Sequence, residues 1–370
     1  DKLKYLLGTT DRPRLHGVPF PWSAWFSDNR QAEDLRLQDA RADATVHVDF
    51  RYLDAHERKS DAWVRRSDEE ALRDRILWVV GGRSEIQLVA NELGRSLRML
   101  ERYRGRSESL TRDKKRLLLE EEARSEDLDR RMRDAVETAW MEGRIYFRGR
   151  SMDPRDLGGS FPVALGTTGG RVLADLYPHF TPTAVTETEL LQLLAVKLSG
   201  TSPKFLEGDL GILSMDAGRI VPTCGGRVPA GILKTIEDHR GTAGSTLFAH
   251  FGRPPYGYPS AVVRACLAGL LRASKIRIRP ESGTEITSIK DPGTQDLFRQ
   301  ERPLRRADIF PAGKGPISPR MRVRISEFLE QTFGGLVDRE NDAIADAVYQ
   351  HFPDQSRRLR DVEERLNRLP

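Results

Sequence analysis

Five basic side chains within a short stretch of the sequence have the clearest capacity for ligand chemistry. They are Arg264, Arg272, Lys275, Arg277 and Arg279. Guanidinium and ammonium groups bind phosphate oxygens, and such contacts position a protein on nucleic acid without reading its sequence. The helix that we expect to carry the first two exposes, besides them, mainly Ser260 and small residues, which do not suit base reading. We therefore predict a module that docks either double-stranded DNA, through non-specific phosphate contacts, or a partner subunit, and a protein-interaction scaffold without nucleic-acid binding is the alternative.

These side chains belong to a segment, Ser245–Ile289, whose pattern predicts a winged helix-turn-helix at about residues 230–290. Apolar residues recur in adjacent pairs every four positions along Ser260–Arg272, which predicts a helix with one buried stripe. The string KIRIR then alternates Ile with basic residues, so the three cations from Lys275 to Arg279 would project from one edge of a strand. PESG turns the chain and TEITSI returns, which predicts the wing as a hairpin.

Two polar residues, His47 and Asp49, share one face of a predicted strand over Thr45–Leu53, and His56 follows in the next loop. An acid and a histidine can act as an acid–base pair or as metal ligands, but neither a cysteine nor a third histidine stands at ligand spacing. We interpret them as surface polar residues. The sequence thus predicts no metal and no catalytic residue, and an enzyme with an unrecognised hydrolytic site is a second alternative.

Phosphate-binding and nucleophile motifs are missing from the sequence. The nearest string to a phosphate loop, Pro311–Ser318, lacks the first glycine and the hydroxyl after Lys314. The glycine-containing strings Thr167–Val172 and Cys224–Gly231 are interpreted as turns, and no Gly-x-Ser-x-Gly elbow occurs. No cofactor is therefore predicted for this chain.

The order of the predicted elements indicates an α+β protein of two or three domains. Residues 1–150 form an α/β region with a long helical arm, residues 151–300 a mixed domain with the winged helix, and residues 301–370 a helical tail. Within the first region we expect a strand over 76–80, a helix over 84–104 and a charged helix over 110–143. The charges of that last helix indicate a solvated face, with a coiled-coil arm as the alternative.

Glycine and proline mark the expected breaks between the remaining elements. We predict strand, loop and strand over 144–184, a linker over Pro292–Pro319, and terminal helices over 319–333, 338–352 and 355–369.

The charge balance is mildly basic, with a net charge of +5. Cys266 lies on the apolar face of its predicted helix, so a buried thiol is expected there. The two cysteines, Cys224 and Cys266, cannot form a disulfide framework, so a reducing, cytoplasmic compartment is predicted. No run approaches the roughly twenty apolar residues of a membrane span, and no membrane partner is expected. The chain opens at Asp1 without a leader, and we interpret it as part of a longer protein.

Several strings together resemble one protein family. FGRPPYGYPSAVVRACLAGLLRASKIRI is similar to the Phe-x-x-x-Pro-Tyr-Gly-Trp segment and following helix in the large P-loop ATPases of BREX phage-resistance systems (the BrxC/PglY type). The stretch that begins RILWVVGG and the tail from IFPAGKG are compatible with the regions beyond the ATPase core of that family. Tyr258 stands where the family pattern has Trp, and Ser274 where it has a small residue or Gly.

The resemblance implies that this chain is a C-terminal, non-catalytic part of such an ATPase. Its partners would be other phage-defence subunits and non-specific double-stranded DNA, and it could be oligomeric. ATP and magnesium would belong to the full-length protein, and no ATPase residue carries over to this chain.

Overall fold

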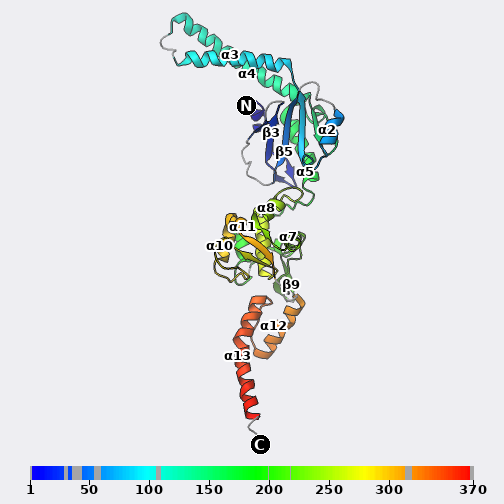
Figure 1. The fold of residues 1–370 in the computed structure, drawn as a ribbon, viewed down its shortest axis with the longest axis vertical. Coiled ribbons are helices and arrows are strands. Elements are labelled where there is room, and N and C mark those ends of the chain that lie inside the picture. The colour runs from blue at the N-terminus through cyan, green and yellow to red at the C-terminus, as the bar shows by residue number, and fades with distance from the viewer. Residues whose placement is uncertain are drawn as a thin grey trace. The chain divides into compact units, whose positions relative to one another are not determined.

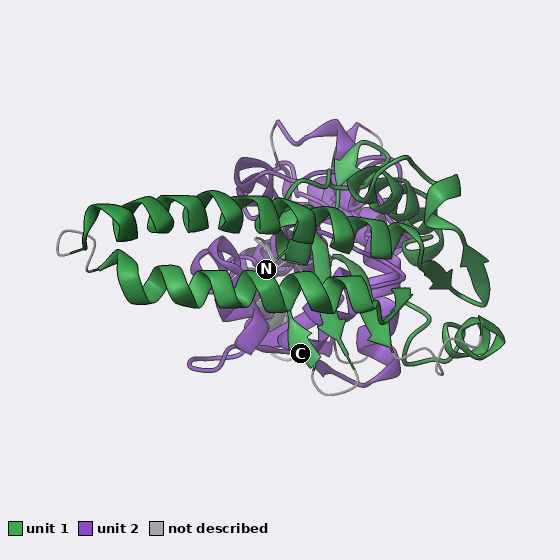
Figure 2. Cartoon of the chain, turned by 90° about the horizontal axis from the view of Figure 1, so that it is seen from above, with its two compact units in different colours: residues 1–178 green, residues 179–370 purple. Residues whose placement is uncertain are grey.

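A computed structural model describes residues 2–28, 32–35, 44–53, 60–105, 110–198, 200–216, 218–312 and 319–366. Helices and strands are mixed, in agreement with an α+β protein, and the chain divides into two compact units, residues 1–178 and 179–370 (Figures 1 and 2). The boundary expected at residue 150 falls on the first residue of β8 (Arg150–Met152), inside the first unit. Residue 300 lies between two helices of the second unit.

A six-stranded mixed sheet forms the centre of the first unit, in the order β4-β3-β5-β6-β7-β8. Its other strands are β4 (Ala32–Asp34), β3 (Trp22–Ser27), β5 (Val46–Leu53), β6 (Arg75–Gly81) and β7 (Arg144–Phe147). The three strands β3, β5 and β6 run parallel, and the outer pairings are antiparallel. The predicted strands over 45–53 and 76–80 are confirmed, because alternation and a continuous apolar run are strong strand signals.

The apolar face of this sheet packs against α5 (Phe161–Leu176). Phe161 stacks on Trp78 with ring centroids 4.8 Å apart, and Phe50 lies 5.8 Å from the same phenylalanine ring. The opposite face carries a smaller core in which Trp63 of α2 (Ser60–Arg66) packs with Leu77 and Tyr146. The short elements α1 (Lys2–Gly8), β1 (Arg14–Leu15) and β2 (Val18–Pro19) complete this end of the unit.

The helix α5 corrects the predicted strand, loop and strand over 144–184. Only the first strand, β7, exists there as expected, and Thr167–Val172 is helix interior rather than a turn. Glycine at position 169 has a packing reason, since a Cβ atom on it would lie 2.5 Å from the Trp22 ring. Of the two glycines that indicated a turn, Gly169 therefore marks a close approach between helix and sheet.

In the sequence, two long helices, α3 (Ser84–Arg104) and α4 (Arg112–Met141), come between the paired strands β6 and β7. They lie side by side and antiparallel, and together form a hairpin that we call the arm (Figures 1 and 2). Both helices were predicted at nearly these bounds. Buried residues recur at spacings of three, four and seven, as in a coiled coil. They are Val89, Leu93, Ser96 and Leu100 on α3, and Leu118, Ser125 and Leu128 on α4. The coiled-coil alternative thus describes α4 better than a wholly solvated face does.

The second unit is built around a three-stranded antiparallel sheet in the order β11-β13-β12. Its strands are β11 (Thr242–Ala243), β12 (Ile276–Arg279) and β13 (Asp308–Pro311). The helices around the sheet are α6 (Glu187–Leu193), α7 (Arg227–Asp238), α8 (Gly244–Gly252), α9 (Ser260–Arg272), α10 (Thr294–Arg299) and α11 (Glu301–Arg306). A separate two-stranded antiparallel sheet pairs β9 (Leu213–Asp216) with β10 (Arg219–Pro222).

Two predictions for this unit are wrong. The segment Pro292–Pro319 is not a linker, because α10, α11 and β13 lie in it and Phe298, Leu304 and Ile309 are buried in the core. The segment TEITSI (Thr284–Ile289), predicted to return as the second strand of the wing, does not form a strand either. It makes a single bridge, Ile278 with Ile286, whereas β12 pairs along its whole length with β13.

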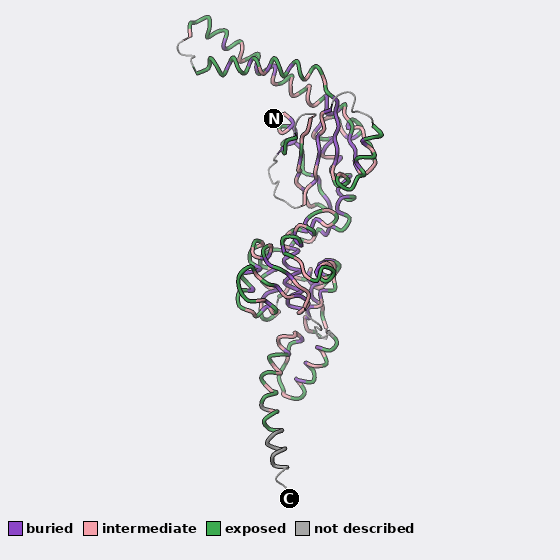
Figure 3. Tube along the Cα trace, viewed as in Figure 1, coloured by how far each residue is buried: buried purple, intermediate pink, exposed green. Residues whose placement is uncertain are grey.

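The buried parts of the trace concentrate in the sheet of the first unit and in the interior of the second, while the arm is largely exposed (Figure 3). The chain ends in α12 (Pro319–Phe333) and α13 (Asn341–Leu366), so one helix replaces the two predicted from 338 onward. Within the described ranges, no helix has both the length and the apolar character needed to cross a bilayer.

Candidate functional site

Arg264 lies in the core of the second unit, which corrects the expectation that α9 exposes it. The residue is 6% exposed, and its guanidinium donates to the carbonyl oxygens of Phe298 and Arg299 at 3.0 and 3.1 Å. It also forms an ion pair with Glu187 of α6. With these partners around it, the side chain is not available to a phosphate group.

Arg272 is buried in the same way at the other end of α9. Its side chain is 0% exposed, and it donates to the carbonyl oxygens of Leu193 and Val196 at 3.0 and 3.1 Å. The guanidinium also donates a charged hydrogen bond of 2.6 Å to the carboxylate of Glu340. The arginine thus satisfies backbone acceptors that the end of α6 would otherwise leave unpaired, and it is also withdrawn from any ligand.

The three remaining cations lie on or next to β12, as predicted, but two of them have partners. Lys275 donates to the carbonyl oxygen of Thr223 at 2.7 Å, and Arg277 pairs with Glu285 at 2.6 Å. The guanidinium groups of Arg277 and Arg279 lie 5.2 and 4.9 Å from the ring centroid of Phe310. Of the five basic residues, only Arg279 is fully on the surface, whereas the others are buried or half-buried.

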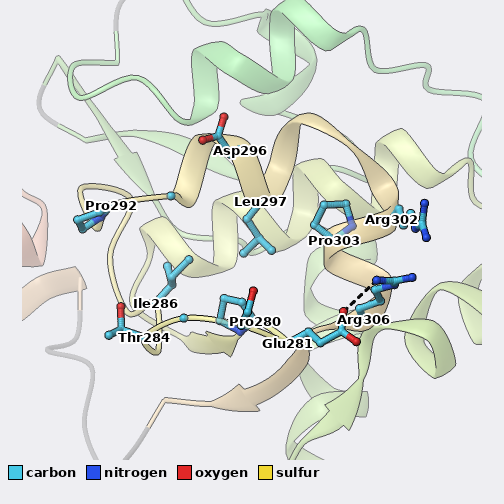
Figure 4. A pocket seen from close by; sticks show the side chains of 13 residues that line it. Pro280, Glu281, Thr284, Ile286, Pro292, Asp296, Leu297, Arg302, Pro303 and Arg306 are labelled. Carbon is cyan, nitrogen blue, oxygen red and sulfur yellow. Dashed lines mark hydrogen bonds and ion pairs between the residues drawn. The ribbon is translucent and has the colours of Figure 1, made fainter.

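A groove of about 420 Å³ opens beside this strand, between the chain that leaves β12 and the helices α10 and α11 (Figure 4). Its apolar lining comes from Pro280, Ile286, Pro292, Leu297 and Pro303. The rim has charges of both signs: Glu281 pairs with Arg306 at 3.0 Å, and Asp296 and Arg302 also line the opening. Apolar walls with a balanced rim suit a polypeptide segment better than a polyanion.

The polar face of the first unit's sheet brings together a serine, a histidine and an acid. Ser23 Oγ lies 2.9 Å from Nδ1 of His47, whose Nε2 lies 2.8 Å from Oδ1 of Asp49. The prediction that His47 and Asp49 share a strand face is confirmed, but Asp49 is only 2% exposed and is not a surface residue. His56 lies outside the described residues.

Two arginines, Arg51 and Arg75, lie beside the carboxylate of Asp49 and stabilise its negative charge. Arg51 donates to its other carboxylate oxygen at 2.9 Å, and a nitrogen of Arg75 lies 3.6 Å from the same oxygen. Burial alone would raise the pKa of Asp49, but the hydrogen bonds and charges of His47 and Arg51 outweigh it and lower that pKa below the ordinary value. The sequence analysis missed Ser23, Arg51 and Arg75, although His47, Asp49 and Arg51 alternate visibly along one strand.

The arrangement has the hydrogen-bond order of a Ser–His–acid triad. The carboxylate, however, is shared with Arg51 and Arg75, and the residues come from three neighbouring strands, β3, β5 and β6. We assign it a structural role as a network that ties these strands in register. Among the residues that the structure describes, no group of three acids, histidines or cysteines is placed to hold a metal ion.

Both cysteines are buried free thiols, as predicted for Cys266. Burial raises the pKa of Cys224 to about 12 and raises that of Cys266 well above its usual range. Thiolates are the reactive form, so neither residue is a candidate nucleophile.

Comparisons of the chain with protein families, with curated proteins and with solved structures found no match.

Proposed function

We propose that the second unit is a winged-helix module that docks a protein partner, and that the chain is a non-catalytic part of a larger assembly. The order of elements supports the winged-helix interpretation. Along the chain, α7, β11, α8, α9 and β12 follow one another as helix, strand, helix, helix and strand, and β13 comes after the two short helices α10 and α11. The sheet order β11-β13-β12 places the last strand in the middle, as that fold requires.

The burial of α9 is the observation that favours a protein over DNA as the ligand of this unit. This helix stands where a winged helix places its recognition helix, which enters the major groove. Every residue from Val262 to Arg272 is buried, and both arginines are bonded within the unit. A helix enclosed in this way cannot present side chains to base edges.

The groove beside β12 is the surface that we assign to the partner. Three proline side chains and two aliphatic ones supply apolar contact area, and removing such area from water favours association. The rim offers Asp296 and Arg302 for polar contacts that fix orientation (Figure 4). An extended segment of another subunit fits this chemistry.

The wider assignment to a phage-defence ATPase of the BREX type rests on the resemblance alone, and we keep it as part of the proposal. In that setting the partner would be another subunit of the defence complex in the cytoplasm. We assign no residue of this chain to ATP or magnesium. A phosphate-loop sequence encoded upstream in the native gene would support this part, and an unrelated upstream sequence would contradict it.

Site-specific photo-crosslinking in the native host tests the docking surface. A photoreactive amino acid replaces Thr284 at the mouth of the groove, and a matched variant carries it at Met215, which is 58% exposed on β9 of the same unit. We expect one protein adduct at position 284 and none at position 215. Equal labelling at both positions, or an adduct only with DNA, would contradict the proposal.

A second measurement tests whether the strand β12 contacts DNA. Arg279→Glu reverses the charge of the exposed cation of β12. A phosphate contact there would make the variant bind random duplex DNA more weakly and would reduce the salt dependence by about one charge. We expect the affinity to be unchanged, and a loss of tenfold or more would restore the DNA interpretation of this strand.

A further inference from the structure

The positive charge of this chain is concentrated at the far end of the arm. Residues 94–105 and 110–117, which we call the arm tip, contain eight Lys and Arg against two Asp and Glu, a net charge of +6. The whole chain has a net charge of only +5. The arm tip therefore accounts for all of the excess, and the rest of the molecule is close to neutral.

Most cations of the arm tip take part in no ion pair. Within the described part of the chain, six exposed basic residues of the tip take part in no ion pair; they are Arg95, Arg98, Arg102, Arg112, Lys114 and Lys115. Near the base of the arm, by contrast, Arg130 pairs with Asp127 at 3.0 Å and Arg133 with Asp129 at 3.5 Å. Unpaired cations attract a polyanion without first having to give up a partner.

Three of these residues form a row. Arg95, Arg98 and Arg102 are three and four positions apart on α3, so they lie on one face of the helix. That face points away from the seam formed with α4, whose α3 side includes Leu93, Ser96 and Leu100. At a rise of about 1.5 Å per residue the row spans about 10 Å, which matches about three successive phosphates of one DNA strand.

An aromatic ring stands next to the row. Tyr103 is 38% exposed, and the guanidinium of Arg102 lies 5.7 Å from its ring centroid. Exposed aromatic rings among cations stack on unpaired bases in proteins that bind single strands. The tip therefore combines the two features that contact with nucleic acid uses.

We infer that the arm tip binds nucleic acid through the phosphate backbone, without sequence specificity. This inference does not depend on the docking function of the second unit, since all of its residues belong to the first. The competing ligand for these cations is the set of acidic residues near the base of the arm on a second copy of the chain. Two of these acids, Asp127 and Asp129, already have arginine partners, so a phosphate backbone offers the cations more than they do.

Fluorescence anisotropy of the full chain with labelled random-sequence duplex DNA tests the inference, with random single-stranded RNA as a second probe. Arg95→Gln, Arg98→Gln and Arg102→Gln are combined, because glutamine retains helix propensity while removing charge. We expect affinity to fall by about tenfold or more, and the slope of log affinity against log salt to decrease by about three, measured from about 50 to 200 mM salt.

The matched control combines Arg124→Gln, Arg130→Gln and Arg131→Gln, which removes the same charge from exposed positions of α4 below the tip. We expect this variant to change affinity less than the tip variant does. Equal losses in the two variants, or no binding of the unaltered chain to either probe, would overturn the inference. Binding to anionic lipid vesicles alone, or self-association that the tip variant abolishes in the absence of nucleic-acid binding, would overturn it too.

Discussion

At the scale of single residues, the arginines of this chain serve two different purposes that the sequence does not distinguish. Arg264 and Arg272 donate to backbone carbonyl oxygens and to one acid each inside the second unit. Arg95 and Arg98 have no such partners in the described structure and remain in solvent. A guanidinium group has five donors in a fixed geometry, so it can bridge several buried acceptors or bind a phosphate equally well. The surroundings decide which.

Asp49 provides a pH-dependent prediction. Its pKa in the folded protein is below the ordinary value of an aspartate, so the carboxylate stabilises the fold at pH values above the unfolded pKa of about 3.9, and this contribution is lost as the pH falls through the folded pKa. Asp49→Asn should lower the free energy of unfolding at neutral pH by about 3 kcal/mol, because Arg51 loses its buried partner.

Denaturant unfolding of both proteins, followed by tryptophan fluorescence between about pH 7 and pH 3, measures this effect. We expect the difference in unfolding free energy between the two proteins to shrink as the pH is lowered. A difference that stays constant over this range would show that the carboxylate charge does not stabilise the network.

At the scale of elements, the sequence predicted those whose signal is local. The helix over 84–104 has the predicted bounds, and its buried residues repeat at heptad spacing along its length. The apolar strand β6 was also identified, since five consecutive apolar residues rarely occur on a surface. The adjacent apolar residues that recur every four positions predicted the helix α9 correctly, but this pattern did not reveal that the opposite face of the helix is buried as well.

Elements that depend on distant partners were missed. The strand β13 pairs with β12 across an intervening stretch that contains two helices, whereas a hairpin with Thr284–Ile289 was the local alternative. Local patterning gives no measure of such long-range pairing. The predicted exposure of Arg264 and Arg272 was wrong for the same reason, because α6, α10 and Glu340, which precedes α13, supply their partners from other parts of the chain.

The glycines of α5 give a matched pair of substitutions. A Cβ atom at position 169 would lie 2.5 Å from the Trp22 ring and 2.9 Å from Pro13, whereas nothing lies within 4 Å of one at position 166. Gly169→Ala should therefore destabilise the first unit by about 1–3 kcal/mol through overpacking. Gly166→Ala should stabilise it by about 0.5–1 kcal/mol, because alanine is the better helix former.

Thermal unfolding of the two variants, measured by tryptophan fluorescence, checks this prediction. Opposite shifts in the midpoint temperature would support the close approach of α5 to the sheet. Stabilisation by both substitutions would mean that Trp22 does not pack on this helix.

At the scale of the whole molecule, each unit has a core of its own. The large apolar cluster of the second unit runs from Val185 to Ile309, and the sheet of the first unit packs between α5 and α2. The chemistry that we propose is divided in the same way, with phosphate contact on the arm of one unit and a peptide groove on the other. Such a division suits a protein that holds nucleic acid and a partner subunit at the same time.

The cores should therefore unfold as separate cooperative units. All five tryptophans lie in the first unit, so their fluorescence reports on that unit alone, while far-ultraviolet circular dichroism reports on both. Leu267→Ala opens a cavity at a fully buried position of the second unit and should destabilise that unit by about 2–5 kcal/mol. We expect the circular dichroism transition to move to lower denaturant while the tryptophan transition stays in place. A common shift of both signals would mean that the units fold as one, and the two proposed activities would then have to be studied as a coupled system.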